Sequence, residues 1–111
     1  MWIMVSGPYT SGDADADKRA ANLRAMNEIA TRLFRAGHIP IIGVNLALPM
    51  VEAAGQGFFD EIMMSISLAV AERCDTCLRI GGPSKGADEE VESFRRRGLP
   101  VYYRLEDVPP P

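Results

Sequence analysis

The sequence predicts an α/β domain with a mainly parallel sheet, because segments typical of strands and helices alternate along the chain. Short β-rich runs are each followed by a longer segment whose apolar residues recur at helical spacing. The length of 111 residues suits one compact domain and leaves little room for a second. Hydrophobic residues make up 47% and charged residues 24%, which is ordinary for a globular protein.

The first half of the chain predicts two strands joined by a long helix. The first strand is expected at Trp2–Ser6, and it ends in a loop of small residues, Gly7–Gly12. Asp13–Asp17 supplies N-cap residues for a helix whose apolar positions are Leu23, Met26, Ile29, Leu33 and Phe34. Gly37 suits the position after that helix, and the second strand is expected at His38–Gly43.

Two prolines and a glycine modify the expectation for the next part of the chain. Pro40 favours the start of the second strand or an edge position in the sheet, because proline cannot donate to the ladder. Pro49, together with Gly55, interrupts any long helix over Asn45–Gly57. We therefore expect a loop with one short helix there, long enough to act as a lid or a dimer contact.

The second half continues the alternation. An amphipathic helix is expected at Phe58–Glu72, then a strand at Asp75–Ile80, a helix at Asp88–Arg97 and a last strand at Gly98–Tyr103. Residues 1–108 then form a single α/β domain, and 109–111 are a tail of prolines. The expected fold has three layers and a sheet of four to five strands, of the Rossmann-like or flavodoxin-like type.

Charge and hydropathy exclude several classes of partner. The net charge of −3 and a pI near 5.1 provide no electrostatic footprint for a nucleic acid polymer. Every apolar run is too short or too interrupted to span a membrane, so no membrane partner is expected. The segment Met1–Ser6 lacks a basic region and a long apolar core, so the cytoplasm is the expected location.

The cysteines and the single histidine are expected to be structural. Cys74 and Cys77 form a C-x-x-C motif, but it lies between a helix end and a strand and not at a helix N-terminus. We therefore favour core packing over a redox role. A zinc site needs about four ligands, and His38 is remote, so no metal and no cofactor are expected.

Two glycine-rich loops follow strands, at Gly7–Gly12 and Gly81–Gly86. Parallel α/β sheets bind ligands outside the carboxyl ends of their strands, so these loops are expected to meet at a ligand site. The second loop leads into a helix whose start carries Asp88, Glu89 and Glu90. These carboxylates either compensate the helix dipole, or one of them faces a cleft and does chemistry.

Four segments together resemble the nucleoside 2-deoxyribosyltransferase superfamily. They are Val5-Ser6-Gly7-Pro8-Tyr9, Ala36-Gly37-His38-Ile39-Pro40, Cys74-Asp75 and Pro83-Ser84-Lys85-Gly86-Ala87-Asp88-Glu89-Glu90. The last is similar to the P-S-x-G-x-x-x-E motif of the deoxynucleoside 5′-monophosphate N-glycosidase branch. The pattern is closest to that of short, largely uncharacterised bacterial and phage members, and it covers most of the chain in element order.

The resemblance implies cleavage or exchange of the N-glycosidic bond of a nucleoside or nucleotide, without a cofactor. Glu90 matches the glutamate that attacks C1′, and Tyr9 the tyrosine that holds it. Ser84 and the turn around Gly86 would hold a 5′-phosphate. The other substrate-binding positions implied are Ser6, Gly7, Pro8 and Asn22. Outside the resemblance, Tyr9 is equally an aromatic lid on the core, Asn22 a surface polar residue, and Ser84 and Gly86 turn residues.

The sequence departs from the family pattern in two places. Ser65 or Ser67 occupies the position of a helix aspartate that assists departure of the base, which leaves Asp60 or Glu61 as the candidate acid. Acidic residues also crowd the first loop, at Asp13, Asp15 and Asp17. These departures favour an alternative, a catalytically inactive nucleotide-binding or interaction module on the same fold. The resemblance also implies a homodimer or higher homo-oligomer, with the helix Phe58–Glu72 as the candidate interface.

Overall fold

The computed structural model describes residues 1–111, in which strands and helices alternate as the sequence predicts. The main elements, in chain order, are β1 (Trp2–Ser6), α1 (Ala16–Arg35), β2 (Ile39–Ile41), α2 (Gly43–Ala54), α3 (Phe59–Arg73), β3 (Thr76–Arg79), α4 (Lys85–Arg96) and β4 (Val101–Tyr102). Short 3₁₀ turns at Gln56–Phe58 and Leu105–Asp107 complete the chain.

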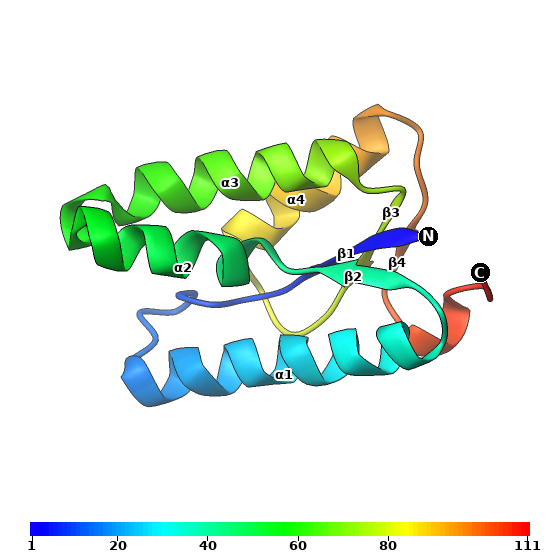
Figure 1. Cartoon of the computed structure of the whole chain (residues 1–111), viewed down its shortest axis with the longest axis horizontal. Helices are drawn as coiled ribbons and strands as arrows, with labels where there is room; N and C mark the ends of the chain where they lie inside the picture. The colour runs from blue at the N-terminus through cyan, green and yellow to red at the C-terminus, as the bar shows by residue number, and fades with distance from the viewer.

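The four strands form one all-parallel sheet in the order β2-β1-β3-β4. Met4 of β1 is in register with Ile41 on one side and Cys77 on the other. Helix α1 covers one face of the sheet, and α2, α3 and α4 lie on the other side (Figure 1). The three-layer, Rossmann-like α/β fold is therefore confirmed.

Each face of the sheet has its own hydrophobic core, because side chains of a strand alternate between the two faces. Ile3 and Val5 of β1 point towards α1, where they pack with Met26, Ala30, Leu33, Ile42 and Leu78. Met4 points the other way and packs with Ala71, Cys74, Cys77, Val91 and Phe94. The strand at the centre of the sheet is thus fixed from both sides.

Local signals at the first crossover act as predicted. The Asp15 carboxylate accepts a hydrogen bond from the backbone N–H of Lys18 at 2.8 Å and caps α1. Gly37 has a φ of +100°, which suits a glycine at the end of a helix. Pro40 lies in β2 at the edge of the sheet, so its missing N–H removes nothing from the central ladder.

The expectation of a loop with one short helix over Asn45–Gly57 is wrong, because a 12-residue helix, α2, runs from Gly43 to Ala54 through Pro49. The side chain of Pro49 is exposed, whereas Ala47 and Val51 are fully buried on the side that packs with α3. Burial of this face outweighs the hydrogen bond that Pro49 cannot donate. The helix ends at Gly55, whose φ is +106°.

The expected start of the last helix at Asp88 is also wrong. Helix α4 begins at Lys85, and the Ser84 hydroxyl caps it by accepting from the backbone N–H of Ala87 at 3.2 Å. Only Asp88 of the three carboxylates lies in the first turn. Glu90 lies further along and is buried, so compensation of the helix dipole does not explain its position.

The two ends of the chain meet beside His38, which has a structural position as predicted. Its Nε2 lies 3.0 Å from the carbonyl oxygen of Pro109 and its Nδ1 lies 3.1 Å from the amino group of Met1. A carbonyl only accepts, so we assign the proton to Nε2. The proline tail does pack on the domain, since Pro111 covers Gly37. None of the helices has the length and hydropathy needed to cross a membrane.

Candidate functional site

A pocket of about 520 Å³ opens at the carboxyl ends of β1 and β3. Its walls come from the loop Gly7–Gly12, from one side of α3, and from the turn and first residues of α4 at Pro83–Ala87. The two glycine-rich loops therefore do converge. They touch directly, because a Cβ on Gly81 would lie 2.7 Å from Cδ of Pro8 and one on Gly7 would lie 3.1 Å from the carbonyl oxygen of Ile80.

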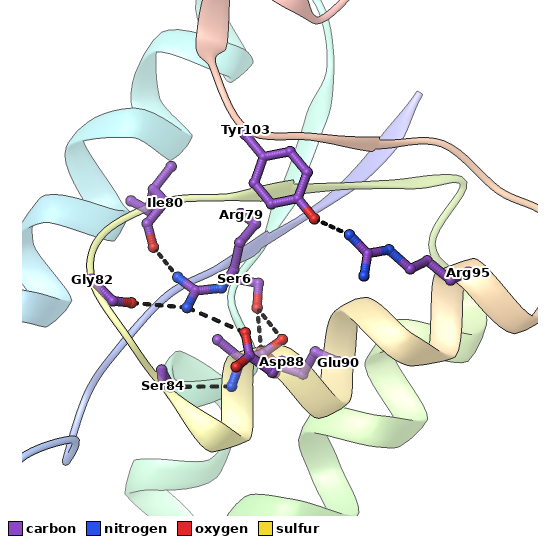
Figure 2. A network of polar contacts seen from close by, with 10 residues as sticks. Ser6, Arg79, Ile80, Gly82, Ser84, Asp88, Glu90, Arg95 and Tyr103 are labelled. Atoms are coloured by element: carbon purple, nitrogen blue, oxygen red, sulfur yellow. Dashed lines mark hydrogen bonds and ion pairs between the residues drawn. The ribbon is translucent and has the colours of Figure 1, made fainter.

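Glu90 is the buried acid of this pocket. Its side chain reaches the pocket from α4, and the residue is only 9% exposed. The hydroxyl of Ser6, at the end of β1, donates a hydrogen bond to Oε1 of Glu90 at 2.6 Å (Figure 2). Ser6 itself is 1% exposed. The carboxyl group is thus fixed from a rigid strand end, while its other oxygen, Oε2, is not held by Ser6.

The environment of Glu90 changes its acidity. Burial raises the pKa of this carboxyl from 4.5 to about 7, because desolvation disfavours the charged form. The hydroxyls of Ser6 and Ser67 and the charge of Arg79 lower the pKa and so oppose part of this effect. The carboxyl group therefore changes its charge near neutral pH, which is typical of groups at functional sites.

A buried arginine holds the turn that forms one wall of the pocket. Arg79, the last residue of β3, donates to the carbonyl oxygens of Ile80 and Gly82, the latter at 2.8 Å. Its guanidinium also pairs with the Asp88 carboxylate at 3.5 Å (Figure 2). Arg79 thus ties together the end of the strand, the glycine turn and the first turn of α4.

The start of α4 lines the pocket with groups suited to an anion. Ser84, Lys85 and Gly86 all contribute to the wall. No atom lies within 4 Å of the place that a Cβ on Gly86 would take, so the backbone there is open to a ligand. Backbone N–H groups and a lysine at a helix N-terminus favour negative charge.

Tyr9 lies in the wall formed by the first loop. Its ring stacks on Phe59 of α3, with ring centroids 6.5 Å apart and an interplanar angle of 18°. No hydrogen bond joins its phenol to Glu90, whereas the hydroxyl of Ser6 does donate to that carboxyl. Asn22 lies outside the wall, and its amide donates to the backbone carbonyl of Tyr9 at 3.0 Å. Asn22 therefore shapes the loop that carries Tyr9.

Helix α3 presents one side to the pocket. The residues on this side are Phe59, Asp60, Met63, Met64 and Ser67. Ser67 is buried near Glu90, whereas Ser65 is exposed and outside the wall. Of the two serines considered at the aspartate position, Ser67 is the one in the pocket. Asp60 also lines the pocket, and Glu61 does not.

Some predicted positions lie behind the wall and not in it. Ser6 sits beneath the pocket under Glu90, and Pro8 packs against Gly81. Sequence reasoning missed Arg79, which looked like one residue of an apolar strand run. Its only signal was its place two residues before the Gly81-Gly82 turn. The link from Ser6 to Glu90 had no signal in the sequence, because the two residues are 84 positions apart.

Neither cysteine lines the pocket, although Cys77 lies near Ser6 and Glu90. Cys77 is in β3 and Cys74 ends α3, and both are buried and free, as predicted. Burial raises the pKa of the Cys74 thiol to about 11 and that of Cys77 to about 12. Both thiols therefore stay protonated and unreactive at neutral pH.

Comparison with known families gives one match across nearly the whole chain. The family model described as "Domain of unknown function (DUF1937)" matches residues 1–105. The matched segment includes all four strands, all four helices and every residue that lines the pocket. No curated protein matches the chain.

Proposed function

The chain belongs to the family of the domain of unknown function DUF1937, and we propose its activity from the pocket. The proposed activity is hydrolysis or transfer of the N-glycosidic bond of a nucleoside or nucleoside 5′-monophosphate. The observation that carries this proposal is a buried carboxyl group, Glu90, held by Ser6 at 2.6 Å and facing a pocket of about 520 Å³. A pocket of this size suits a small organic ligand. The resemblance to the nucleoside 2-deoxyribosyltransferase superfamily supports the choice of bond.

In the proposed reaction Glu90 is the nucleophile. Oε2 of the carboxylate attacks C1′, the bond from C1′ to the base nitrogen breaks, and its electron pair leaves with the base, which takes up a proton from solvent. Water, or the N–H nitrogen of a second base, then attacks C1′, gives up a proton to solvent and releases Glu90 as carboxylate. The transition state has oxocarbenium character, which a nearby carboxylate stabilises. Ser6 positions the carboxyl group and favours its ionised form.

The remaining walls suit the other parts of such a substrate. The stacked rings of Tyr9 and Phe59 offer an aromatic surface beside which a base can lie. Ser84, Lys85 and Gly86 at the start of α4 suit a 5′-phosphate. The acidic residues Asp13, Asp15 and Asp17 do not line the pocket, and Asp15 is engaged in capping α1. These carboxylates therefore do not lie in the wall beside the proposed phosphate position.

A second candidate function is a catalytically inactive nucleotide-binding module on the same fold. The observation that favours it is Ser67, which lines the pocket and is one of the two serines that the resemblance to the nucleoside 2-deoxyribosyltransferase superfamily matches to a helix aspartate. A serine hydroxyl is too weak an acid to protonate a departing base as a carboxyl group would. Asp60 is the other carboxyl group in the wall and the candidate acid in its place.

The proposed assembly is a homodimer through α3 and the neighbouring α2. Large apolar side chains are exposed on these helices and on the turn between them, at Leu46, Met50, Phe58 and Met64. Exposed apolar groups on packed neighbouring helices are suited to a second copy of the chain. Light scattering at micromolar concentration is expected to give twice the monomer mass, and a monomer would contradict the assembly.

The test of the activity is release of free base from a panel of nucleosides and their 5′-monophosphates, followed by chromatography. Glu90→Gln removes the nucleophile at nearly constant size, and Glu92→Gln is its control, because Glu92 is exposed on the same helix. The proposal expects release that Glu90→Gln abolishes and Glu92→Gln retains. Binding without release by the folded wild-type protein would favour the inactive module instead.

A further inference from the structure

The pocket contains a second carboxylate, Asp60, which lies on α3 and not on α4 with Glu90. Glu90 and Asp60 are the only acidic residues in its wall. Ser67, which lies near Glu90, is seven residues after Asp60 on the same helix. Seven residues of α-helix span two turns, or about 10 Å along the axis. Asp60 therefore lies about two helical turns from the part of α3 that is next to Glu90.

The surface between these two carboxylates suits a flat ring. Met63 and Met64 lie on α3 between Asp60 and Ser67, and they face the same pocket. Phe59, the residue before Asp60, stacks on Tyr9, and both residues line the pocket. An aromatic and thioether surface binds the face of a planar heterocycle but offers no hydrogen bond to its edge. The charged group that α3 offers beside this surface is the carboxylate of Asp60.

We propose that Asp60 makes the pocket selective for bases that carry an exocyclic amino group, such as cytosine and adenine. This inference rests on the proposed function, since it needs the sugar carbon C1′ to lie at Glu90. An ionised carboxylate only accepts hydrogen bonds. An amino group on the base edge can donate to it, whereas a carbonyl oxygen at the same place presents a lone pair and leaves both groups unpaired.

This role differs from that of a general acid. Asp60 is exposed to solvent and lies in the first turn of α3, where the helix dipole favours negative charge. Its side chain makes no hydrogen bond or ion pair within the protein, so its oxygens are open to a ligand. An acid acts on every substrate alike, whereas an acceptor at the base edge acts on one class of base.

The experiment compares substrates that differ only in this group, cytidine against uridine 5′-monophosphate and adenosine against inosine 5′-monophosphate. The wild-type protein is expected to prefer the amino member of each pair by about tenfold in kcat/KM, the equivalent of one unbalanced hydrogen bond. Asp60→Asn keeps the size of the side chain but can also donate, and it is expected to reduce the preference to within about threefold. Glu61→Gln, next to it but outside the wall, is the matched control and is expected to change nothing.

Each alternative has its own signature. Equal preference in the wild type and Asp60→Asn, or a uniform loss of rate on all four substrates, would overturn the selectivity and leave the glycosidase proposal standing. If no base is released, the same pairs are compared by their dissociation constants with the wild-type protein. A preference for the amino member that Asp60→Asn removes would support the inference for a binding module, and its absence would overturn it.

Discussion

Ser6 and Glu90 are 84 residues apart in the chain, yet the hydroxyl of one lies 2.6 Å from the carboxyl oxygen of the other. Their contact joins the end of the central strand to α4, and both residues are buried. A site held by two regular elements keeps its geometry better than one held by loops alone. The chemistry proposed for this pocket depends on that contact.

The buried carboxyl of Glu90 makes the stability of the protein depend on pH. Its pKa is about 7 in the folded state and near 4.5 when unfolded, so the folded state binds the proton more tightly. The stabilisation of the folded state by this tighter proton binding is fully present below pH 4.5 and is lost as the pH rises through about 7. The free energy lost has an upper limit on the order of 3 kcal/mol. Urea denaturation at pH 5.5 and pH 8 is expected to show the lower free energy of unfolding at pH 8.

Glu90→Gln provides the control for that measurement. A glutamine at this position has no charge to bury, so the loss of stability between the two pH values is expected to shrink in the variant. The variant should also be more stable than the wild type at pH 8. An unchanged pH dependence would mean that another group causes it.

Removal of the Ser6 hydroxyl is expected to shift the activity to higher pH. Ser6 favours the ionised form of Glu90, so Ser6→Ala raises the pKa of that carboxyl further. Hydrogen bonds to charged groups contribute about 1.5–3 kcal/mol, so base release at pH 7 should fall by about tenfold or more. The measurement is the pH profile of kcat/KM. Ser93→Ala, a buried serine outside the pocket, should leave the midpoint unchanged.

Arg79 is expected to be needed for the shape of the turn. Arg79→Met leaves the carbonyl oxygens of Ile80 and Gly82 without their donor and should lower the stability by about 2–4 kcal/mol. Arg79→Met also removes a charge that lowers the pKa of Glu90, so the pH midpoint of activity should rise. Arg79→Lys keeps that charge but not the planar fork that holds the turn, so it should restore the pH midpoint without restoring substrate affinity. Arg24→Met, which breaks an exposed ion pair on α1, should change the stability by less than about 0.5 kcal/mol. Equal effects of Arg79→Met and Arg24→Met would contradict the role of Arg79.

Close packing of α2 on α3 beneath the pocket depends on Gly43. A Cβ at this position would lie 2.7 Å from Oγ and 3.2 Å from Cα of Ser67. Gly43→Ala therefore forces the helices apart and should cost about 1–3 kcal/mol in thermal or urea unfolding. Gly57→Ala is the control, because no atom lies within 4 Å of its Cβ position. A Gly43→Ala protein as stable as the control would show that the two helices can adjust.

Neither cysteine should react in the folded protein. Burial raises the pKa of Cys74 to about 11 and that of Cys77 to about 12, and only the thiolate attacks a disulfide reagent. An aromatic disulfide reagent at pH 8 is expected to modify both cysteines in denaturant and neither in buffer. Fast modification of the native protein would reopen a redox role for the C-x-x-C motif.

The parts of the fold that local residues determine could be predicted from the sequence. The strand Trp2–Ser6 matches its prediction, and Asp15 and Gly37 bound the first helix as expected, because capping and strand patterns act over a few residues. Helix α2 could not be predicted in the same way. Pro49 and Gly55 are local breaking signals, whereas the burial of Ala47 and Val51 that outweighs Pro49 exists only after α3 has packed.

The same division holds for the candidate site. Convergence of two glycine loops follows from parallel topology, and it could be predicted. The inward position of Glu90 could not be derived from the acidic helix start, which favoured a role in compensating the dipole. The resemblance singled out Glu90, but not Ser6 as its hydrogen-bond donor. Contacts between residues far apart in the chain, such as that of Ser6 with Glu90, emerge only from the packed structure.

The most direct test of the central claim is to look for sugar bound to Glu90. A nucleoside 5′-monophosphate that releases its base is mixed with stoichiometric protein, the reaction is stopped in acid within one turnover, and the protein is digested and weighed by mass spectrometry. A sugar phosphate attached to the peptide that contains Glu90, and absent from Glu90→Gln, is the predicted result. Base release within that turnover with no attached sugar would contradict a nucleophilic role for Glu90.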